Sequence, residues 1–250
     1  MSIKGVVEAI RWQFVKLINM FLKLQTIHWM PQENIDLAET FDKYNNDEFF
    51  FVQIGANDGI TGDSLRKYIE KYEWRGILVE PVPYVFKRLM DNYKGFQNLH
   101  FENAAVSSIT GHSKFYSVNE YDLDNNNLFE KYDAYKIDQL SSFDLKTVMK
   151  HSYMHPNFEK LITEVDIPTI SFDDLINKYK VHKIDLLQID CEGYDFEILN
   201  AIDLTKVAPA IIIFEHQHIN LNDYKKLINK TKQHGYKNHR IKWDTVSIKM

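Results

Sequence analysis

Hydrophobic and polar positions follow two alternating patterns from residue 49 to the end of the chain. Short apolar runs rich in aromatic and β-branched residues predict buried strands at 49–54, 77–80, 100–106, 183–190 and 210–214. Apolar residues spaced three and four positions apart predict helices at about 62–72, 84–93, 172–179, 196–199 and 221–231. Residues 112–118 predict an additional strand, and 235–250 predict a terminal β-hairpin. Alternating strands and helices indicate an α/β fold, with a mostly parallel twisted sheet and helices on both faces.

The first 48 residues are predicted to form a helical extension in front of a domain that spans 49–250. Apolar residues between positions 3 and 24 recur at alternating steps of four and three, which is typical of one helix face. Charges interrupt every apolar run well short of a membrane span, and no small-residue cleavage site follows, so we expect no secretory signal. We expect the apolar face to pack on the domain, in a homodimer, or peripherally on an anionic membrane. A short helix is predicted around 37–44.

Residues 119–165 lack a clear period, and we expect them to form a lid or insert over the substrate site. His151 and His155 have the i,i+4 spacing that can hold a metal on a helix. Pro156 disfavours helical geometry at the residue before it, and neither histidine has a neighbouring glutamate. We therefore do not predict a metal at this pair.

Composition narrows the choice of partner and compartment. The chain has 250 residues, 44% hydrophobic and 26% charged, which suits a globular protein with a sizeable core. Its formal net charge of −5 predicts no nucleic-acid partner. The single cysteine, Cys191, excludes an internal disulfide and a cysteine-based zinc site, and fits a cytoplasmic protein. Because no feature marks it as a reactive thiolate, we expect Cys191 to be a buried small residue.

A glycine loop follows the first predicted strand. Its sequence is Gly55-Ala56-Asn57-Asp58-Gly59, and its glycines let the backbone turn sharply and approach a ligand closely. Strand, loop and helix open a nucleotide-binding βαβ unit, although the spacing is not the dinucleotide pattern G-x-G-x-x-G. Glu80 ends the next predicted strand about 20 residues later, where a carboxylate can accept hydrogen bonds from both hydroxyls of a ribose.

Acids and histidines also end two strands predicted later in the chain. Asp190 and Glu192 follow the strand at 183–190, and Glu215 and His216 follow the strand at 210–214. Ligands of open α/β sheets lie beyond the carboxyl ends of the strands, so a second substrate could meet a cofactor there. A single acid at a strand end is often a helix cap, but the occurrence of several together favours a functional site.

Five segments together resemble the successive motifs of the FkbM-type methyltransferases, namely VQIGANDG, GILVEPVPYVFKRL, ENAAVS, IDLLQIDCEGYDFEIL and IIIFEH. The resemblance implies a Rossmann-like class I methyltransferase fold that uses S-adenosyl-L-methionine, usually with an oxygen nucleophile of a sugar, glycan or natural product as acceptor. The cofactor-binding residues that it implies are Gln53, Gly55, Asn57, Asp58, Gly59, Glu80, Asn103, Ala104 and Asp190. By this resemblance Glu80 would hold the ribose, and Asn103 and Ala104 would lie near the adenine. Asp190 would stand beside the transferring methyl group.

Gln53 departs from the family pattern, because many members have an acid at this position. An acid there often helps to hold the cationic amino end of the cofactor. Gln53 can accept a hydrogen bond but brings no charge. We therefore expect Asp190 or Asp58 to supply that share of the cofactor's binding energy.

The acceptor hydroxyl is a weak nucleophile, so its proton should leave as the new bond forms. The candidate catalytic bases are Asp190, Glu192 and His216. His216 is preferred because an unperturbed imidazole is mostly neutral at pH 7. The alternative is a divalent metal, Mg²⁺ or Mn²⁺, held by Asp190, Glu192 and Glu215. The sequence leaves both mechanisms open.

The leading hypothesis is therefore an S-adenosylmethionine-dependent O-methyltransferase with a small-molecule or glycan acceptor. One alternative is a non-catalytic scaffold that retains the fold and works through its N-terminal helix. Another is a nicotinamide-dependent oxidoreductase, against which the absence of G-x-G-x-x-G argues.

Overall fold

The computed structural model describes residues 35–118, 139–152 and 158–250. The helix predicted over residues 1–30, with its homodimer or membrane contact, lies outside the described residues. So do His155, Pro156 and residues 119–138.

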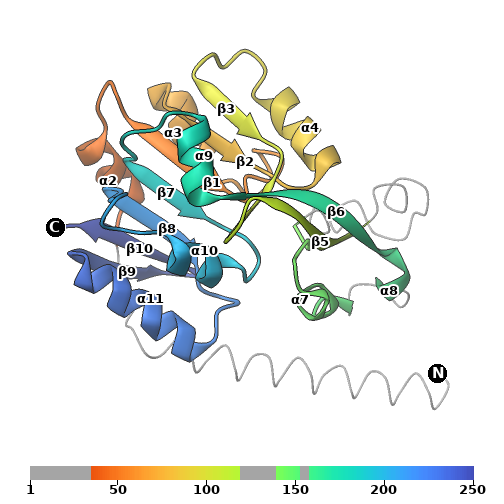
Figure 1. The fold of residues 1–250 in the computed structure, drawn as a ribbon. Helices are drawn as coiled ribbons and strands as arrows, with labels where there is room; N and C mark the ends of the chain where they lie inside the picture. The colour runs from red at the N-terminus through yellow and green to blue at the C-terminus, as the bar shows by residue number, and fades with distance from the viewer. Residues whose placement is uncertain (1–34, 119–138, 153–157) are drawn as a thin grey trace, which may run out of the picture.

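Seven strands form the central sheet, in the order β3-β2-β1-β7-β8-β10-β9 (Figure 1). They are β1 Phe50–Ile54, β2 Arg75–Val79, β3 Leu99–Glu102, β7 Leu186–Ile189, β8 Ile211–Glu215, β9 Tyr236–Ile241 and β10 Asp244–Lys249. Strands β3, β2, β1, β7 and β8 pair in parallel, and β10 is antiparallel to both of its neighbours. The predicted mostly parallel sheet and C-terminal hairpin are confirmed.

Helices cover both faces of this sheet. They are α2 Leu37–Tyr44, α3 Arg66–Tyr72, α4 Pro83–Asn92, α9 Phe172–Lys178, α10 Asp195–Ala201 and α11 Leu221–Gln233. Successive strand residues point to opposite faces, so each strand contributes to two cores. Val52 and Ile54 of β1 belong to the core beneath α9, α10 and α11. Phe51, between them, belongs to the core beneath α2, α3 and α4. The strand ends that carry the site are thus clamped from both sides.

The short helix predicted around 37–44 is confirmed as α2. Asp36 caps it by accepting a hydrogen bond from the backbone N–H of Ala38 at 2.8 Å. Phe41 is fully buried, and its ring packs edge-on against Tyr68 and Trp74. This part of the predicted extension therefore packs into the core of the domain, and the boundary after residue 48 stays a prediction.

The single strand predicted at 100–106 is wrong, because the chain turns between β3 and β4 (Ala105–Ser107). At the turn, the side-chain amide of Asn103 donates to the carbonyl oxygens of Glu80 and Pro81, at 2.8 and 3.1 Å. After the turn, β4 leaves the central sheet and pairs with β6 (Ile162–Ser171). Strand β6 also pairs with β5 (Gly111–Val118), which completes a separate three-stranded sheet that the sequence did not predict.

The described parts of the predicted insert pack around this second sheet (Figure 1). Residues 162–165, assigned to the insert, form the start of β6. Two short helices precede it, α7 Leu145–Met149 and α8 Phe158–Leu161. Val118, Val148 and Phe158 belong to a small apolar core that joins both helices to β5. A role for this region as a lid stays a prediction.

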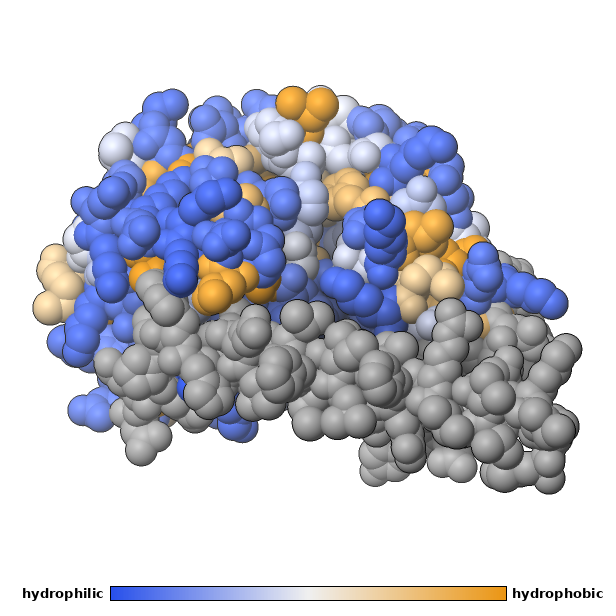
Figure 2. All heavy atoms as spheres, turned by 90° about the horizontal axis from the view of Figure 1, so that it is seen from below, coloured by the Kyte–Doolittle hydropathy of each residue, from blue (hydrophilic) through white to orange (hydrophobic). Residues whose placement is uncertain are grey.

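No helix of the described residues is both long and apolar enough to cross a membrane. Hydrophilic residues predominate on the face shown in Figure 2, with smaller hydrophobic areas between them.

Candidate active site

A cavity of about 890 Å³, counting the part open to solvent, lies beyond the carboxyl ends of β1, β2 and β7. This is where an open parallel sheet is expected to bind its ligand. The predicted site residues that line it are Gln53, Gly55, Asn57, Glu80, Ala104, Asp190 and Glu192. The cavity lining does not include the other predicted residues, which are Asp58, Gly59, Asn103, Glu215 and His216.

The two glycines of the loop allow close packing of the protein on itself. Gly55 has φ +82°, and a Cβ there would lie 1.8 Å from the carbonyl oxygen of Asp190. Gly59 has φ +70°, and a Cβ there would lie 2.4 Å from a ring carbon of Tyr93 in the segment after α4. Both positions therefore require glycine for a steric reason that does not involve a ligand.

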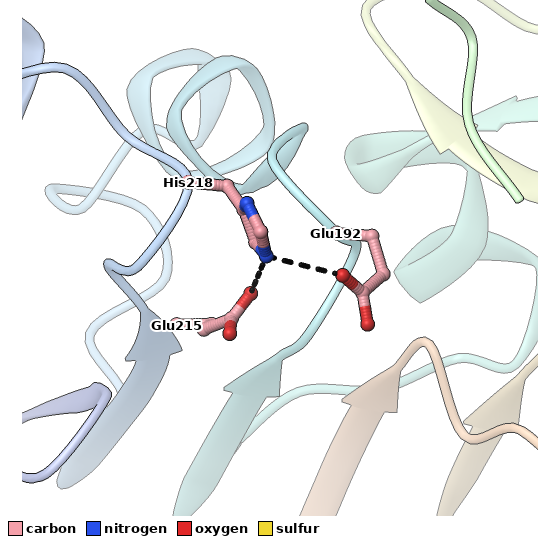
Figure 3. Close-up of side chains that lie close together, drawn as sticks. All are labelled: Glu192, Glu215 and His218. Atoms are coloured by element: carbon pink, nitrogen blue, oxygen red, sulfur yellow. Dashed lines mark ion pairs between the residues drawn. The ribbon is translucent and has the colours of Figure 1, made fainter. Parts of the chain in front are cut away.

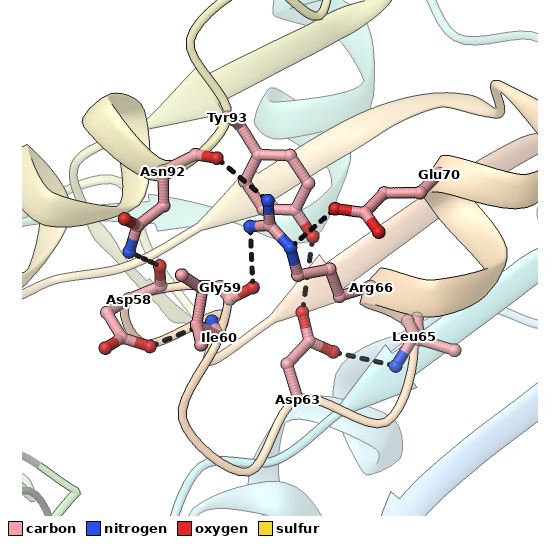
Figure 4. Close-up of polar contacts among 9 residues, drawn as sticks. All are labelled: Asp58, Gly59, Ile60, Asp63, Leu65, Arg66, Glu70, Asn92 and Tyr93. Atoms are coloured by element: carbon pink, nitrogen blue, oxygen red, sulfur yellow. Dashed lines mark hydrogen bonds and ion pairs between the residues drawn. The ribbon is translucent and has the colours of Figure 1, made fainter.

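Asp58 shapes the loop from behind. Its carboxylate accepts hydrogen bonds from the backbone N–H groups of Ile60 and Thr61, at 2.9 and 2.6 Å. Arg66 of α3 donates to the carbonyl oxygen of Gly59, and Asn92 donates to that of Asp58 (Figure 4). The structure thus gives Asp58 a bracing position, and its contact with a cofactor stays a prediction.

Glu80 is positioned on the cavity wall by two backbone donors. Its Oε2 accepts from the N–H of Asn57 at 3.0 Å, and its Oε1 accepts from the N–H of Val82 at 2.9 Å. Carboxylate oxygens are the acceptors that the two hydroxyls of a ribose require. Asn103 supports Glu80 through its backbone and does not line the cavity.

Three amide side chains on the cavity wall carry buried polar atoms for which residues 35–118, 139–152 and 158–250 offer no hydrogen-bond partner. These atoms are Oε1 of Gln53, Oε1 of Gln188, and both polar atoms of the Asn57 side chain. Gln53 and Gln188 lie opposite each other in the register of β1 and β7. Because buried polar groups are normally paired, these side chains fit a cavity built for a polar ligand.

Asp63 supplies the acid that position 53 lacks, although sequence reasoning missed it. Its Oδ1 accepts from the Gln53 side-chain amide at 3.3 Å and from the backbone N–H of Leu65 at 2.7 Å. The Tyr93 hydroxyl donates to its other oxygen at 3.3 Å (Figure 4). Asp63 also lines the cavity, and burial raises the pKa of its carboxyl. An acid just before a helix is usually read as a cap, so only the fold shows its second role.

Asp190 faces the open cavity from the end of β7, and its side chain is accessible to solvent there. The surrounding walls still remove much of the water around this carboxyl. This desolvation, together with the charge of nearby Glu192, raises the pKa of Asp190 to about 7. Fully buried Asp195 holds the turn by accepting from the N–H groups of Cys191 and Gly193. Cys191 is partly buried, and burial raises the pKa of its thiol, so it remains protonated.

The structure does not bring His216 to the cavity. Its side chain is 1% exposed, its Nδ1 lies 3.1 Å from Oγ1 of Thr245, and its ring packs on Tyr224. Neighbouring residues at the end of a strand point to opposite sides, and the side that His216 takes is the core under α11. Burial also lowers its pKa to about 4. This position does not support the predicted role of His216 as the general base.

His218, two residues further on, meets the acids instead (Figure 3). Its Nε2 lies 3.3 Å from Oε2 of Glu192 and 3.9 Å from Oε2 of Glu215. Burial and the charge of Glu192 raise the pKa of Glu215 to about 10. The structure therefore brings together only two of the predicted metal ligands, Glu192 and Glu215. The third member of their group is His218 and not Asp190. The sequence signal was present, since His218 follows the same strand end.

The cavity thus lies beyond the strand ends of a mostly parallel seven-stranded sheet. The model of the methyltransferase FkbM domain matches residues 53–237. The chain belongs to that family. The resemblance of its motifs to FkbM methyltransferases is therefore confirmed.

Solved structures resemble the chain at low sequence identity. A methyltransferase FkbM from Methylobacillus flagellatus is 14% identical, with a TM-score of 0.44 over 80% of this chain and 43% of that one. This chain therefore spans less than half of that protein. A precorrin-6y C5,15-methyltransferase from Geobacter metallireducens is 14% identical, with a TM-score of 0.40 over 84% of each chain. A SAM-dependent methyltransferase from Aquifex aeolicus is 8% identical, with a TM-score of 0.38 over 94% of this chain and 95% of that one. No curated protein matches the chain.

Proposed function

We propose that this chain transfers a methyl group from S-adenosyl-L-methionine to a hydroxyl group of a sugar, glycan or natural-product acceptor. The observation that carries the proposal is the position of Asp190, a carboxyl group with a pKa of about 7 that faces the cavity beside Glu192. A group with such a pKa can accept a proton near neutral pH. An oxygen nucleophile needs such a proton acceptor, because a hydroxyl must lose its proton as it is methylated.

The cavity wall offers a matching contact for each part of the cofactor. Glu80 would accept hydrogen bonds from the ribose hydroxyls, and Ala104 leaves room beside it for the adenine. Asn57 and the pair of Gln53 and Asp63 would face the charged methionine end. When bound, S-adenosylmethionine supplies a methyl group activated by its sulfonium charge.

On the acceptor side, the protein must orient a hydroxyl and take its proton. Orientation contributes much of the rate, because the acceptor oxygen has to lie in line with the bond that breaks. The carboxylate form of Asp190 would receive the hydroxyl proton, while Glu192 adds a second acceptor on the same loop. Aromatic rings of Phe115, Phe143 and Tyr194 form a further wall, which can contact the flat face of a ring.

The test is transfer of a labelled methyl group into pools of glycans and nucleotide sugars. We expect labelled product with the wild-type chain and a loss on the order of 100-fold with Asp190→Asn, while cofactor binding is retained. Asp173→Asn, in an exposed acid of α9, is the matched control and should keep full transfer. If neither cofactor form binds at millimolar concentration, the proposal fails.

The same experiment separates the remaining alternatives. A non-catalytic scaffold would bind the cofactor and transfer no label to any pool. An oxidoreductase would quench nicotinamide fluorescence, which we do not expect for a member of this methyltransferase family. We also propose a cytoplasmic location, consistent with the single cysteine.

A further inference from the structure

We propose that Glu192, Glu215 and His218 form a binding site for one divalent transition-metal ion at the acceptor side of the cavity. The inference rests on the proposed function only for the role of the metal, since binding itself can be measured without methyl transfer.

The geometry of the three side chains is that of convergent ligands. One ligand atom from each residue, two carboxylate oxygens and an imidazole nitrogen, can be chosen so that all three lie within 4.8 Å of one another. They come from two neighbouring strand ends, Glu192 after β7 and the other two at and after β8 (Figure 3). Glu192 also lines the cavity, so an ion held here would be reached from it.

An unsatisfied oxygen points to a missing partner at this site. Oε2 of Glu215 is buried and meets no hydrogen-bond donor among the described residues, and its 3.9 Å separation from His218 Nε2 exceeds hydrogen-bond length. Among the described residues, the basic side chain that pairs with Glu192 and Glu215 is His218. A cation would satisfy the buried oxygen and offset the charge of the two glutamates that converge here.

The ligand types favour a transition metal over magnesium. Magnesium prefers oxygen ligands and retains its waters, whereas an imidazole nitrogen suits metals such as Zn²⁺, and carboxylates suit Mn²⁺. The Gln217 side-chain amide, 3.1 Å from Nε2 of His218, makes the contact that an ion would replace. His151 borders the group, with its ring centroid 6.4 Å from that of His218. A divalent ion here would lower the pKa of a hydroxyl that it coordinates, which is the role we assign to it.

The test measures binding of Mn²⁺ to the full chain by the loss of its free electron paramagnetic resonance signal, with Zn²⁺ and Mg²⁺ as competitors. We expect one Mn²⁺ per chain, displaced by Zn²⁺ far more readily than by Mg²⁺. Glu192→Gln, Glu215→Gln and His218→Ala should each weaken binding by on the order of 10- to 100-fold. Glu197→Gln, in an exposed acid of α10, should bind like the wild type.

Two measurements keep the result interpretable. Binding of S-adenosylhomocysteine and the circular dichroism of each variant verify that the fold and the cofactor cavity survive. Loss of Mn²⁺ binding with both retained supports the site. Absence of saturable Mn²⁺ and Zn²⁺ binding at millimolar concentration, or equal affinity in all four variants, overturns it.

The outcome is separable from that of the proposed function. Mn²⁺ binding at the three residues without any methyl transfer would leave the site standing and refute the proposed activity. Methyl transfer that persists after complete chelation, yet stops in His218→Ala, would overturn the role assigned to the metal and make His218 a base.

Discussion

The carboxylates at the two sides of the cavity differ in their hydrogen bonding. At the end of β1 and β2, Asp58 and Glu80 each accept hydrogen bonds from two backbone N–H groups. At the end of β7 and β8, Glu215 has a buried oxygen that meets no donor among the described residues, and its pKa is raised to about 10. The first pair of acids is held by backbone donors, whereas the second end gathers several acids and leaves this oxygen of Glu215 unsatisfied.

This difference separates two tasks. Backbone donors hold the acids on the cofactor side in place before any ligand binds. Binding therefore has to order fewer side chains, which lowers its entropic cost. The acid-rich side carries an electrostatic cost in the free chain that a proton or a cation can relieve. Stability should therefore depend most on the first side, and pH and ions should act most on the second.

The largest expected effect is on folding, from Gly55→Ala. The added Cβ would lie 1.8 Å from the backbone oxygen of Asp190, at φ +82°. We expect a loss of about 3 kcal/mol or more in the free energy of unfolding, measured with urea. Gly95→Ala is the matched control, since Gly95 has φ +104° but open space around it, and should lose only about 1 kcal/mol. Equal losses would show that the contact between β1 and β7 is unimportant.

Glu80→Ala should have the next largest effect, on cofactor affinity. It removes the predicted ribose acceptor and the acceptor of two backbone bonds at once. We expect S-adenosylhomocysteine to bind on the order of 100-fold more weakly in calorimetry. Glu102→Gln, at the end of β3 beside Lys178 and outside the cavity lining, should bind normally. Unchanged binding of S-adenosylhomocysteine by Glu80→Ala would show that the cofactor does not bind at the ends of β1 and β2.

Asp63→Asn should weaken the same binding by about tenfold. The substitution keeps the side-chain size but removes the charge that lies beside Gln53. We expect this tenfold loss of affinity for the intact cofactor, and a smaller loss for an analogue that lacks the amino group. A similar loss for both ligands would mean that Asp63 acts only by bracing the loop.

The smallest expected effect is on the pH dependence of stability, through Asp195 at the acid-rich side. Because burial raises the pKa of Asp195, the folded chain keeps a proton that the unfolded chain releases above pH of about 4. Stability therefore falls as pH rises above that value. Asp195→Asn should be more stable than wild type at pH 8 by about 1 kcal/mol, roughly 2–4 °C in Tm, and the gain should vanish near pH 4.

Asp203→Asn should show the opposite sign. Hydrogen bonds from Thr205 lower the pKa of the partly exposed Asp203, so its stabilising contribution is present at neutral pH and lost as pH falls. Thermal unfolding of both variants across pH 4–8 compares the two. A gain for Asp195→Asn that did not change with pH would exclude titration as its cause.

Much of this protein was determined by its sequence alone. The periods of its apolar residues predict the α/β fold and the positions of most strands, because burial of those residues drives both. The successive motifs identify the FkbM family, and the positions of Gly55, Glu80 and Asp190 at strand ends predict which loops form the cavity. These features are local in the chain, so their pattern can be read without coordinates.

Only the tertiary structure decided which side chains meet. It separated β4 from β3 into a second sheet, and it brought Asp63 to Gln53 across ten residues of loop and turn. It also buried His216 against Tyr224 and placed His218 beside Glu192. Alternation turns His216 away from its neighbour Glu215, and the turn after β8 brings His218 back to the acids, a direction of which composition carries no signal. The partners of a polar group are set by the packing of distant segments, which the order of residues alone does not specify.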